Sequence, residues 1–532
     1  MTQPLVKIGQ RSIAVSAVVV STLNLLGKVL GMVKTLVIAW VFGASGVVDA
    51  FMVAYMLPTV LPTIFKSMIT TAFVPQFMRS LSQNQHRVHW RGANTLFTFS
   101  CLLAIGFAAV LALFPGALVI VVAPGLPEKT FQLATSLTRI MATGAVILGV
   151  NAILTAIAYA RQRFVFASLE SIVVNSFVIA GCLVFVPIYG VVALALSVVA
   201  GFAAQTVILI ASNWGLLYRA VRPAFDWRHE DFRGPLRHMF PLVVGSVGAL
   251  ALGIVDQIFA SYLDAGSIAV LGYATTLALV PMEVFGHAIR TTFYPALSKN
   301  HADGNRGELR RTHINGLRLY ILIMLPCMAI LVWFAEPTVA VLFERGSFTA
   351  DTTQRTAAVV IALAIGLLSR AVAWFNFSVF HALVKPWIPV TLGLVEVLIN
   401  ICLTWILVGP FGIFGIALAT SISLTITAIV TTVMITRELE FRVVPALIEP
   451  FIKISLMTAV MLVFAASTGN LLFVTFRPEG VFWANAALLA GIVPGAIAFL
   501  VTGILLRLGE IRSALGLLEQ KWNLRPGRLF GG

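Results

Sequence analysis

Charged residues are scarce in this chain of 532 residues, where Asp, Glu, Lys and Arg together make up only 11%. A soluble domain carries roughly 25% charged residues, so the composition excludes an ordinary soluble protein. Hydrophobic residues make up 59% of the chain. A helix needs about 20 apolar residues to cross a bilayer, and by that measure we count about fourteen membrane-spanning helices. The expected fold is therefore an all-α integral membrane protein.

Motifs of catalysis and metal binding are also missing. The eight His residues form no HExxH sequence, and neither a Walker sequence nor a GxSxG elbow occurs. The four cysteines make no CxxC pair and stand singly inside apolar runs, which predicts small core residues: Cys101, Cys182, Cys327 and Cys402. The expected extracytoplasmic loops are too short to carry a transferase active site. We therefore expect no enzyme, no cofactor and no metal.

Acidic residues are few, 21 against 36 Lys and Arg, which leaves a net charge of +15. This excess does not indicate nucleic acid, because the basic residues concentrate in every second predicted loop. The longest such loop runs from Tyr218 to His238. The positive-inside rule places these loops in the cytoplasm and predicts that both termini are cytoplasmic. The residues before Arg11 are expected to be a short cytoplasmic lead rather than a cleavable signal.

The two halves of the chain repeat each other. With a shift of 220 positions the second helix aligns with the eighth, and the ending Thr-x-Phe-x-Pro at 71–75 recurs at 291–295. With a shift of 222 the fourth helix aligns with the tenth, and Gly190 meets Gly412. Chance identity between apolar helices is the alternative, which the shared ending disfavours. Six-helix units repeated in one orientation are parallel repeats, and in such transporters the substrate site lies between the two lobes.

The repeat and the basic loops together predict how the chain is divided. Each lobe holds six helices, and the last two helices have no counterpart in either lobe. The predicted parts are an N-lobe (1–217), a basic cytoplasmic linker (218–238), a C-lobe (239–446), helices 13 and 14 (447–508) and a basic cytoplasmic tail (509–532).

Four charged residues fall in or beside the first two predicted helices: Lys28, Lys34, Asp49 and Lys66. A charge at mid-bilayer costs roughly 2.5–3.5 kcal/mol, so such a side chain usually faces a protein interior or a hydrated cavity. Gly27 and Gly31 form a small-xxx-small pair, which favours close helix packing. Pro58 and Pro62 are expected to break the second helix, as in a helix that lines a mobile cavity.

Two polar stripes follow the helical period on repeat-equivalent helices. Residues spaced by four and three share a helix face, as do Glu283, His287 and Arg290, continued back by Thr276. The equivalent face of the second helix carries Thr59, Thr63, Lys66 and Thr70. We predict that both faces line a shared hydrated cavity. The alternative is that Glu283 and Arg290 neutralise each other as a structural pair inside one lobe.

The other charges leave more than one interpretation open. Lys28 and Lys34 lie six residues apart, roughly 120° around an ideal helix, so they share a face only if the helix deforms. Snorkelling to the membrane interface is the alternative for both. Asp49 either complements a helix dipole or takes part in gating. Asp256 and Arg370 are the deepest of the remaining charges, and structural pairing stands beside gating for each.

Several segments carry a family resemblance. They are Val-Phe-Gly-Ala at 41–44, Ala-Phe-Val-Pro at 72–75, Phe-Ala-Ser-Tyr-Leu at 259–263 and, most specific, Leu-Phe-Glu-Arg-Gly-Ser-Phe-Thr at 342–349. These segments resemble the MurJ/MviN family of the multidrug/oligosaccharidyl-lipid/polysaccharide exporter superfamily. The resemblance covers nearly the whole chain and implies two six-helix lobes around a cationic cavity, with helices 13 and 14 building a groove for a lipid tail. The implied activity is flipping of lipid II, the undecaprenyl-diphosphate-linked peptidoglycan precursor, across a bacterial inner membrane.

The chain departs from the family's pattern in that cavity. The family's arginines on the first helix are Lys28 and Lys34 here, and the acid usually beside the second is Thr35. The arginine of the second helix is replaced at 62–63, and the Ala-Asp-Arg of the eighth helix is Ala-Thr-Thr at 274–276. Lysine keeps the charge but lacks the forked donor geometry that suits a diphosphate. We therefore expect weaker binding of the head group, and poor rescue or none of a strain depleted of its lipid II flippase.

Together these residues predict a flippase that moves a polyprenyl-diphosphate-linked glycan precursor, lipid II or a related lipid-linked oligosaccharide, to the outer leaflet by alternating access. The alternatives are an exopolysaccharide repeat-unit flippase, a drug or small-molecule antiporter, and a non-transporting scaffold of the same superfamily. Expected partners are the lipid-linked substrate, membrane lipids and cell-wall or polysaccharide synthesis proteins, with no nucleic acid. The residues expected to bind substrate are Lys28, Lys34, Lys66, Arg290, Thr63 and Thr276. Those expected in gating or coupling are Asp49, Glu283, His287, Asp256 and Arg370.

Overall fold

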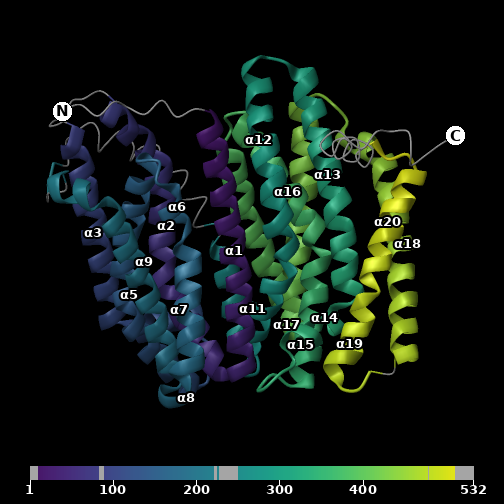
Figure 1. The fold of residues 1–532 in the computed structure, drawn as a ribbon, viewed down its shortest axis with the longest axis horizontal. Coiled ribbons are helices and arrows are strands. Elements are labelled where there is room, and N and C mark those ends of the chain that lie inside the picture. The colour runs from purple at the N-terminus through teal and green to yellow at the C-terminus, as the bar shows by residue number, and fades with distance from the viewer. Residues whose placement is uncertain are drawn as a thin grey trace. The chain divides into compact units, whose positions relative to one another are not determined.

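The structure, a computed structural model, describes residues 10–82, 89–220, 224–226, 248, 250–476 and 478–509. Every regular element in these ranges is a helix (Figure 1). The chain forms two compact units, one of Met1–Val270 with Arg345–Phe348 and the other of Leu271–Glu344 with Thr349–Gly532. Most of the predicted linker (218–238) and of the basic tail (509–532), together with the first nine residues, lies outside the described residues.

Unit 1 is built around one central helix, α5, which packs against α2, α3 and α9, while α1 packs on α7 (Figure 1). Long apolar stretches form these helices, since a helix satisfies its backbone hydrogen bonds within the bilayer. Their bounds are α1 (Gln10–Phe42), α2 (Gly46–Ser82), α3 (His89–Leu113), α4 (Pro115–Val122), α5 (Glu128–Ala160), α6 (Phe164–Ser168), α7 (Glu170–Val184), α8 (Val186–Tyr189) and α9 (Val191–Ala220).

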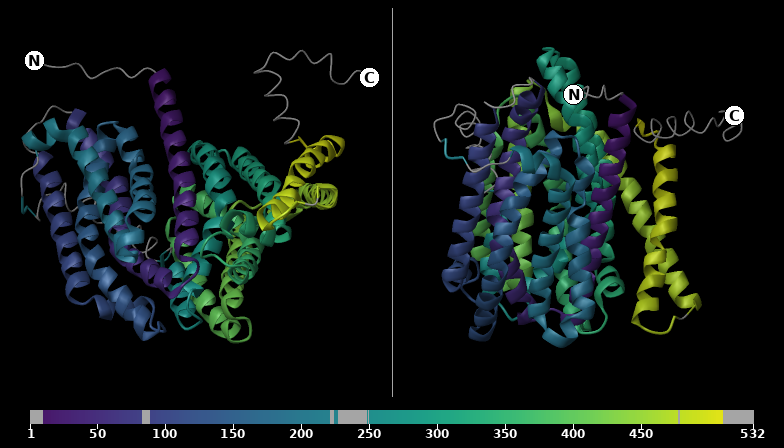
Figure 2. Two further views of the ribbon diagram at one scale, coloured as in Figure 1. Left: turned by 60° about the horizontal axis from the view of Figure 1, so that its bottom comes forward. Right: turned by 60° about the vertical axis from the view of Figure 1, so that its left-hand side comes forward.

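Unit 2 packs α13 between α12, α16 and α18. Helix α18 also packs against α20, and the two are the yellow pair in both views of Figure 2. A short π-helix, η1, precedes α12 directly after Pro281. The bounds are α11 (Ser267–Ala278), whose first four residues belong to unit 1, η1 (Met282–Gly286), α12 (His287–Ala302), α13 (Arg306–Trp333), α14 (Ala335–Phe343), α15 (Ala350–Ile365), α16 (Leu367–Ala382), α17 (Trp387–Glu438), α18 (Val443–Phe476), α19 (Val481–Ala490) and α20 (Ile492–Leu505).

The described residues hold nine helices long and apolar enough to cross a membrane, or up to twelve if each bent pair counts as one span. Two further features bring this count closer to the predicted number of about fourteen membrane-spanning helices. The 52-residue α17 contains a non-helical Gly412 and so joins two of the predicted helices, and residues Leu250–Ser261 form the described part of the seventh. The all-α membrane fold is confirmed.

The predicted third helix is broken in the structure. Helices α3 and α4 meet at an angle of 90°. The cause lies at Phe114, whose backbone (φ −123°, ψ 44°) leaves the helical region directly before Pro115. Proline disfavours helical geometry in the residue before it and supplies no N–H of its own, so it starts the new helix α4 instead.

The second helix behaves in the opposite way. Helix α2 runs without interruption from Gly46 to Ser82, so the prediction that Pro58 and Pro62 break it is wrong. Pro62 is buried against the rest of unit 1, and packing of this kind stabilises a transmembrane helix through its prolines.

The internal repeat is confirmed by the helix bounds. Shifted by 222 positions, α5 falls on residues 350–382, the range that α15 and α16 cover together. The backbone repeats as well, because Gly190 (φ 60°, ψ −149°) and Gly412 (φ 54°, ψ −132°) share an unusual conformation. Gln162 and Val384, related by the same shift, have φ angles of 58° and 59°. Positive φ is uncommon outside glycine, so its recurrence at equivalent positions indicates a true repeat.

Residues 345–348, here called the clasp, belong to unit 1 although the helices on either side belong to unit 2. The backbone N–H of Ser347 donates to the carbonyl of Trp40 at 2.9 Å, and the Ser347 hydroxyl donates to the carbonyl of Val41 at 2.8 Å. Gly346 has φ +61°, and a Cβ there would lie 2.4 Å from the Trp40 carbonyl oxygen. The clasp is therefore seated on the end of α1 by contacts that only glycine permits.

We expect Gly346→Ala to lower the free energy of unfolding by roughly 2–4 kcal/mol, the sum of left-handed strain and an overpacked contact. Gly304→Ala is the matched control, because Gly304 has φ +68° but nothing within 4 Å of its Cβ position. That variant carries the strain alone, about 1–2 kcal/mol. Thermal unfolding of the purified protein in detergent measures both. Equal shifts for the two variants would show that the clasp is not packed as described.

Candidate functional site

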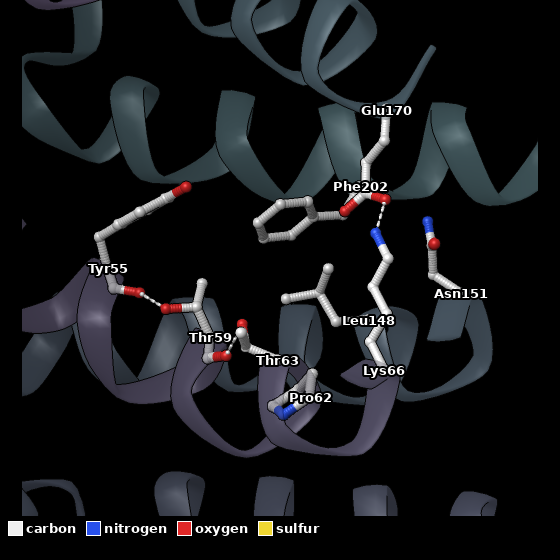
Figure 3. Close-up of a pocket in the computed structure, with 9 residues that line it drawn as sticks. All are labelled: Tyr55, Thr59, Pro62, Thr63, Lys66, Leu148, Asn151, Glu170 and Phe202. Atoms are coloured by element: carbon white, nitrogen blue, oxygen red, sulfur yellow. Dashed lines mark hydrogen bonds and ion pairs between the residues drawn. The ribbon is translucent and has the colours of Figure 1, made fainter. Parts of the chain in front are cut away.

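A polar cavity of about 260 Å³ lies inside unit 1 between α2, α5, α7 and α9. We call it the unit 1 cavity. Figure 3 shows its walls, which are unusual for a membrane protein interior because they combine two charges with hydroxyl and amide groups. The residues that line it are Tyr55, Thr59, Pro62, Thr63, Lys66, Leu148, Asn151, Glu170 and Phe202.

An ion pair spans this cavity. The Lys66 ammonium on α2 donates to the Glu170 carboxylate at the start of α7, as the dashed line in Figure 3 marks. The two side chains are 34% and 25% exposed. A second cavity of about 340 Å³ shares Tyr55, Lys66, Glu170 and Phe202 with the first and extends toward Asn24 on α1. The ion pair therefore stands where two polar spaces meet.

Helix α1 is held close to α7 at the predicted small-xxx-small pair. A Cβ on Gly27 would lie 2.8 Å from the Cβ of Ser171, so only glycine allows this approach. The carbonyl of Gly27 accepts hydrogen bonds from the Ser171 hydroxyl and the Asn175 amide, both at 3.2 Å. Lys28 follows directly and is half-buried. Its backbone is thus fixed by packing on α7.

Lys34 does not reach the ion pair but lies beside the unit 1 cavity. Its ammonium sits over the ring of Tyr55, 5.6 Å from the ring centre. Tyr55 lines both cavities of unit 1. A cation over an aromatic face is attracted by the ring quadrupole. Whether Lys34 binds substrate or extends to the membrane interface stays a prediction.

Asp49 joins the start of α2 to the start of α11. Its side chain is only 3% exposed, and its carboxylate accepts hydrogen bonds from the backbone N–H groups of Gly266, at 2.5 Å, and Ala269, at 2.8 Å. These N–H groups belong to a helix N-terminus, where they lack partners within the helix and favour negative charge. The dipole interpretation thus applies to α11, a helix more than 200 residues further along the chain.

In unit 2 the residues of the predicted polar stripe, which lie on η1 and α12, surround one aromatic ring. Glu283, in the π-helix η1, pairs with His287 at 3.8 Å. His287 meets the Trp374 ring edge-on, with ring centres 5.2 Å apart, and the Arg290 guanidinium lies 5.5 Å from the centre of the same ring. π-Helical turns are frequent at functional sites. The structure thus brings three predicted residues together with Trp374 of α16.

Among the remaining predicted residues, two threonines bond to their own helices. Thr63 and Thr276 each donate their hydroxyl to a backbone carbonyl four residues earlier, at 2.7 and 2.8 Å. Asp256 and Arg370 are half-buried in unit 1 and unit 2 respectively. Whether Lys28, Lys66 and Arg290 share one space involves both units and stays a prediction.

An apolar groove of about 470 Å³ runs along unit 2 between α13, α16, α17 and α18. We call it the unit 2 groove. Apolar side chains dominate its wall, among them Ile429, Val433, Leu447 and Phe451. Helix α18, the first of the two additional helices, forms one side of it.

Glu170 was missed as a site residue because its sequence neighbours gave it no partner. A signal was present: Glu170, Ser171 and Asn175 place polar groups at spacings of one and four residues on the otherwise apolar α7. Ser171 and Asn175, four residues apart, share one helix face, and Glu170 directly precedes Ser171. For metals, the part of the chain that the structure describes contains no group of three or more His, Cys, Asp or Glu side chains that could hold an ion.

Comparison with known proteins identifies the family. The family model "Lipid II flippase MurJ" matches residues 38–489. A probable lipid II flippase MurJ of Buchnera aphidicola is 28% identical over 456 residues, covering 84% of this chain and 88% of the relative. A lipid II flippase MurJ of Burkholderia cenocepacia is 27% identical over 420 residues, covering 75% and 79%.

Solved structures show the same fold. A lipid II flippase MurJ in an inward closed conformation superimposes with a TM-score of 0.79 at 23% identity, covering 92% of this chain and 99% of the other. An inward-facing multidrug resistance MATE family transporter of the MOP superfamily gives 0.64 at 16% identity, covering 80% and 98%. The long match of the family model decides between the two kinds of transporter. This multi-pass membrane protein belongs to the MurJ family of lipid II flippases.

Proposed function

We propose that the protein flips lipid II, or a closely related polyprenyl-diphosphate-linked glycan, from the cytoplasmic to the outer leaflet. The observation that carries the proposal is the family match across residues 38–489, nearly the full set of helices. Relatives that cover 75–84% of this chain carry the name lipid II flippase MurJ. The substrate's diphosphate requires cations, and its polyprenyl tail requires an apolar surface.

The residues of each unit support these two requirements separately. Lys28, Lys34 and Lys66 supply cations in unit 1, and Arg290 supplies one in unit 2, with the hydroxyls of Thr63 and Thr276 as further polar groups. Charge-assisted hydrogen bonds to phosphate are roughly twice as strong as neutral ones, so these cations are the main binding groups. The unit 2 groove, bounded by α18, offers an apolar wall for the lipid tail.

The transport cycle we propose is alternating access between an N-lobe (1–217) and a C-lobe (239–446), joined by a basic linker (218–238). Residues 447–508 supply the tail groove, and 509–532 form the cytoplasmic tail. Asp49, Glu283, His287, Asp256 and Arg370 act in gating or coupling. The alternation of basic loops supports an inner-membrane position with both termini in the cytoplasm. Partners are the lipid-linked substrate, membrane lipids and the enzymes that make or use the glycan.

A second candidate is an exopolysaccharide repeat-unit flippase. The neutral residues Thr63 and Thr276, with lysines in place of arginines at 28 and 34, favour it, because they leave fewer forked donors for one particular diphosphate head group. Both candidates share the polyprenyl-diphosphate part of the substrate and differ in the glycan.

The test is rescue of a bacterial strain depleted of its own lipid II flippase, with this chain expressed at graded levels. We expect poor growth at low expression and improvement at high expression, because weaker head-group binding is compensated by more transporter. Membrane levels measured by immunoblot control for expression. No rescue at any level, from protein that is present in the membrane, would contradict lipid II as the substrate and favour the exopolysaccharide candidate.

A further inference from the structure

The Lys66–Glu170 pair is an unexpected feature for a cavity that is to bind an anion. Lys66 was predicted as a substrate-binding cation, yet in the structure its ammonium is bound by a carboxylate of the same unit. The pair brings no net charge to the unit 1 cavity. A diphosphate arriving there meets Glu170 as a competitor for the cation it needs.

The setting argues against a purely structural pair. A buried ion pair is weak evidence of stability, because desolvation of both charges often exceeds their mutual attraction. Here both side chains keep a quarter to a third of their surface exposed, and they face cavities of about 260 and 340 Å³ on two sides. A polar, partly hydrated site in a membrane protein is a functional candidate. Space for a ligand group lies directly beside the pair.

The neighbours of the pair can bind a polar group that enters. Thr59, Thr63 and Asn151 line the first cavity, and Asn24, Ser171 and Asn175 line the second. Hydroxyls and amides bind phosphate, sugar or peptide oxygens without adding charge. Among the residues that line the two cavities, Lys66 is the only one with a positive charge, and its ammonium is paired with Glu170.

We propose that Glu170 is a specificity-determining residue that competes with the anionic head group of the transported lipid for Lys66. The head group binds by displacing the Glu170 carboxylate from the ammonium, and it leaves when Glu170 pairs with Lys66 again. This exchange keeps binding weak enough for release, which a transporter needs on the far side of the membrane. The inference rests on the proposed function, because it takes a diphosphate-bearing lipid as the ligand.

The test is equilibrium binding of radiolabelled farnesyl diphosphate to the full-length protein in detergent, with farnesol as the uncharged counterpart. We expect Glu170→Gln to bind the diphosphate about tenfold more tightly than the native protein, the factor carried by one charge-assisted hydrogen bond. Glu170→Asp, which keeps the charge but shortens the side chain, is expected to lie between the two. Lys66→Ala loses the preference for the diphosphate over farnesol. In flipping assays, Glu170→Gln lowers KM and kcat together.

Glu128→Gln is the matched control, because Glu128 is an exposed acid of unit 1 that lines neither cavity. It is expected to bind as the native protein does, and thermal unfolding verifies that every variant is folded. If the native protein prefers the diphosphate but Glu170→Gln and Glu170→Asp bind it no more tightly, this inference is wrong. The proposed function then still stands. If neither the native protein nor Glu170→Gln prefers the diphosphate, both proposals fail.

Discussion

Replacing Asp49 by Ala is expected to abolish transport and to lower the free energy of unfolding by roughly 3–5 kcal/mol. The carboxylate is almost fully buried and accepts from the backbone N–H groups of Gly266 and Ala269 at the start of α11. Each of these buried donors, left without a partner, costs about 1–3 kcal/mol. The same change frees the start of α2 from the first residues of α11, which belong to the same unit. Flipping in proteoliposomes and thermal unfolding in detergent measure the two effects.

Two further variants identify the cause. Asp49→Asn retains one acceptor oxygen but loses the charge that favours a helix N-terminus, so we expect a smaller loss, about 1–2 kcal/mol. Asp351→Ala removes an exposed acid from the first turn of α15 and is expected to cost less than about 1 kcal/mol. An Asp49→Ala protein that unfolds and transports like the native chain would refute a structural role for the two hydrogen bonds.

The fold could be predicted from the sequence because hydropathy and periodicity determine it directly. Length of apolar runs gave the helices, and the repeat with a 222-position shift gave the equivalence of α5 with α15 and α16. The misses were local. Proline has two opposite outcomes here: it ends α3 at Phe114, whereas α2 continues through Pro58 and Pro62. Tertiary packing decides between these outcomes, and a single sequence does not contain it.

The candidate site was harder to predict, because its pairs join residues far apart in the chain. Helical spacing correctly grouped Glu283, His287 and Arg290, whose contacts are local. It could not find that Lys66 pairs with Glu170, 104 residues away, or that Asp49 caps a helix 217 residues further on. Partners of this kind depend on which helices pack together. Single charges in apolar helices were therefore recognised as functional candidates without their partners.

The largest effect on substrate binding is expected at Lys28. Lys28→Ala is expected to abolish transport, whereas Lys28→Arg retains it, because arginine keeps the charge and adds a forked donor for a diphosphate. The position of Lys28 is fixed by the neighbouring Gly27, whose carbonyl accepts from Ser171 and Asn175 on α7. Loss of one hydrogen bond to a charged group costs about 1.5–3 kcal/mol, which corresponds to a roughly tenfold to hundredfold weaker head-group affinity.

Lys453→Ala is the matched control for this prediction. Lys453 lies on α18, pairs with Glu449 at 2.6 Å, and lines neither cavity of unit 1. Its removal takes away one positive charge without touching the proposed binding groups, so transport is expected to stay at the native rate. Lys28→Gln separates charge from side-chain length and is expected to fail as Lys28→Ala does. Transport by Lys28→Gln at the native rate would show that the charge of Lys28 is not required, and that α1 contributes shape rather than a phosphate-binding cation.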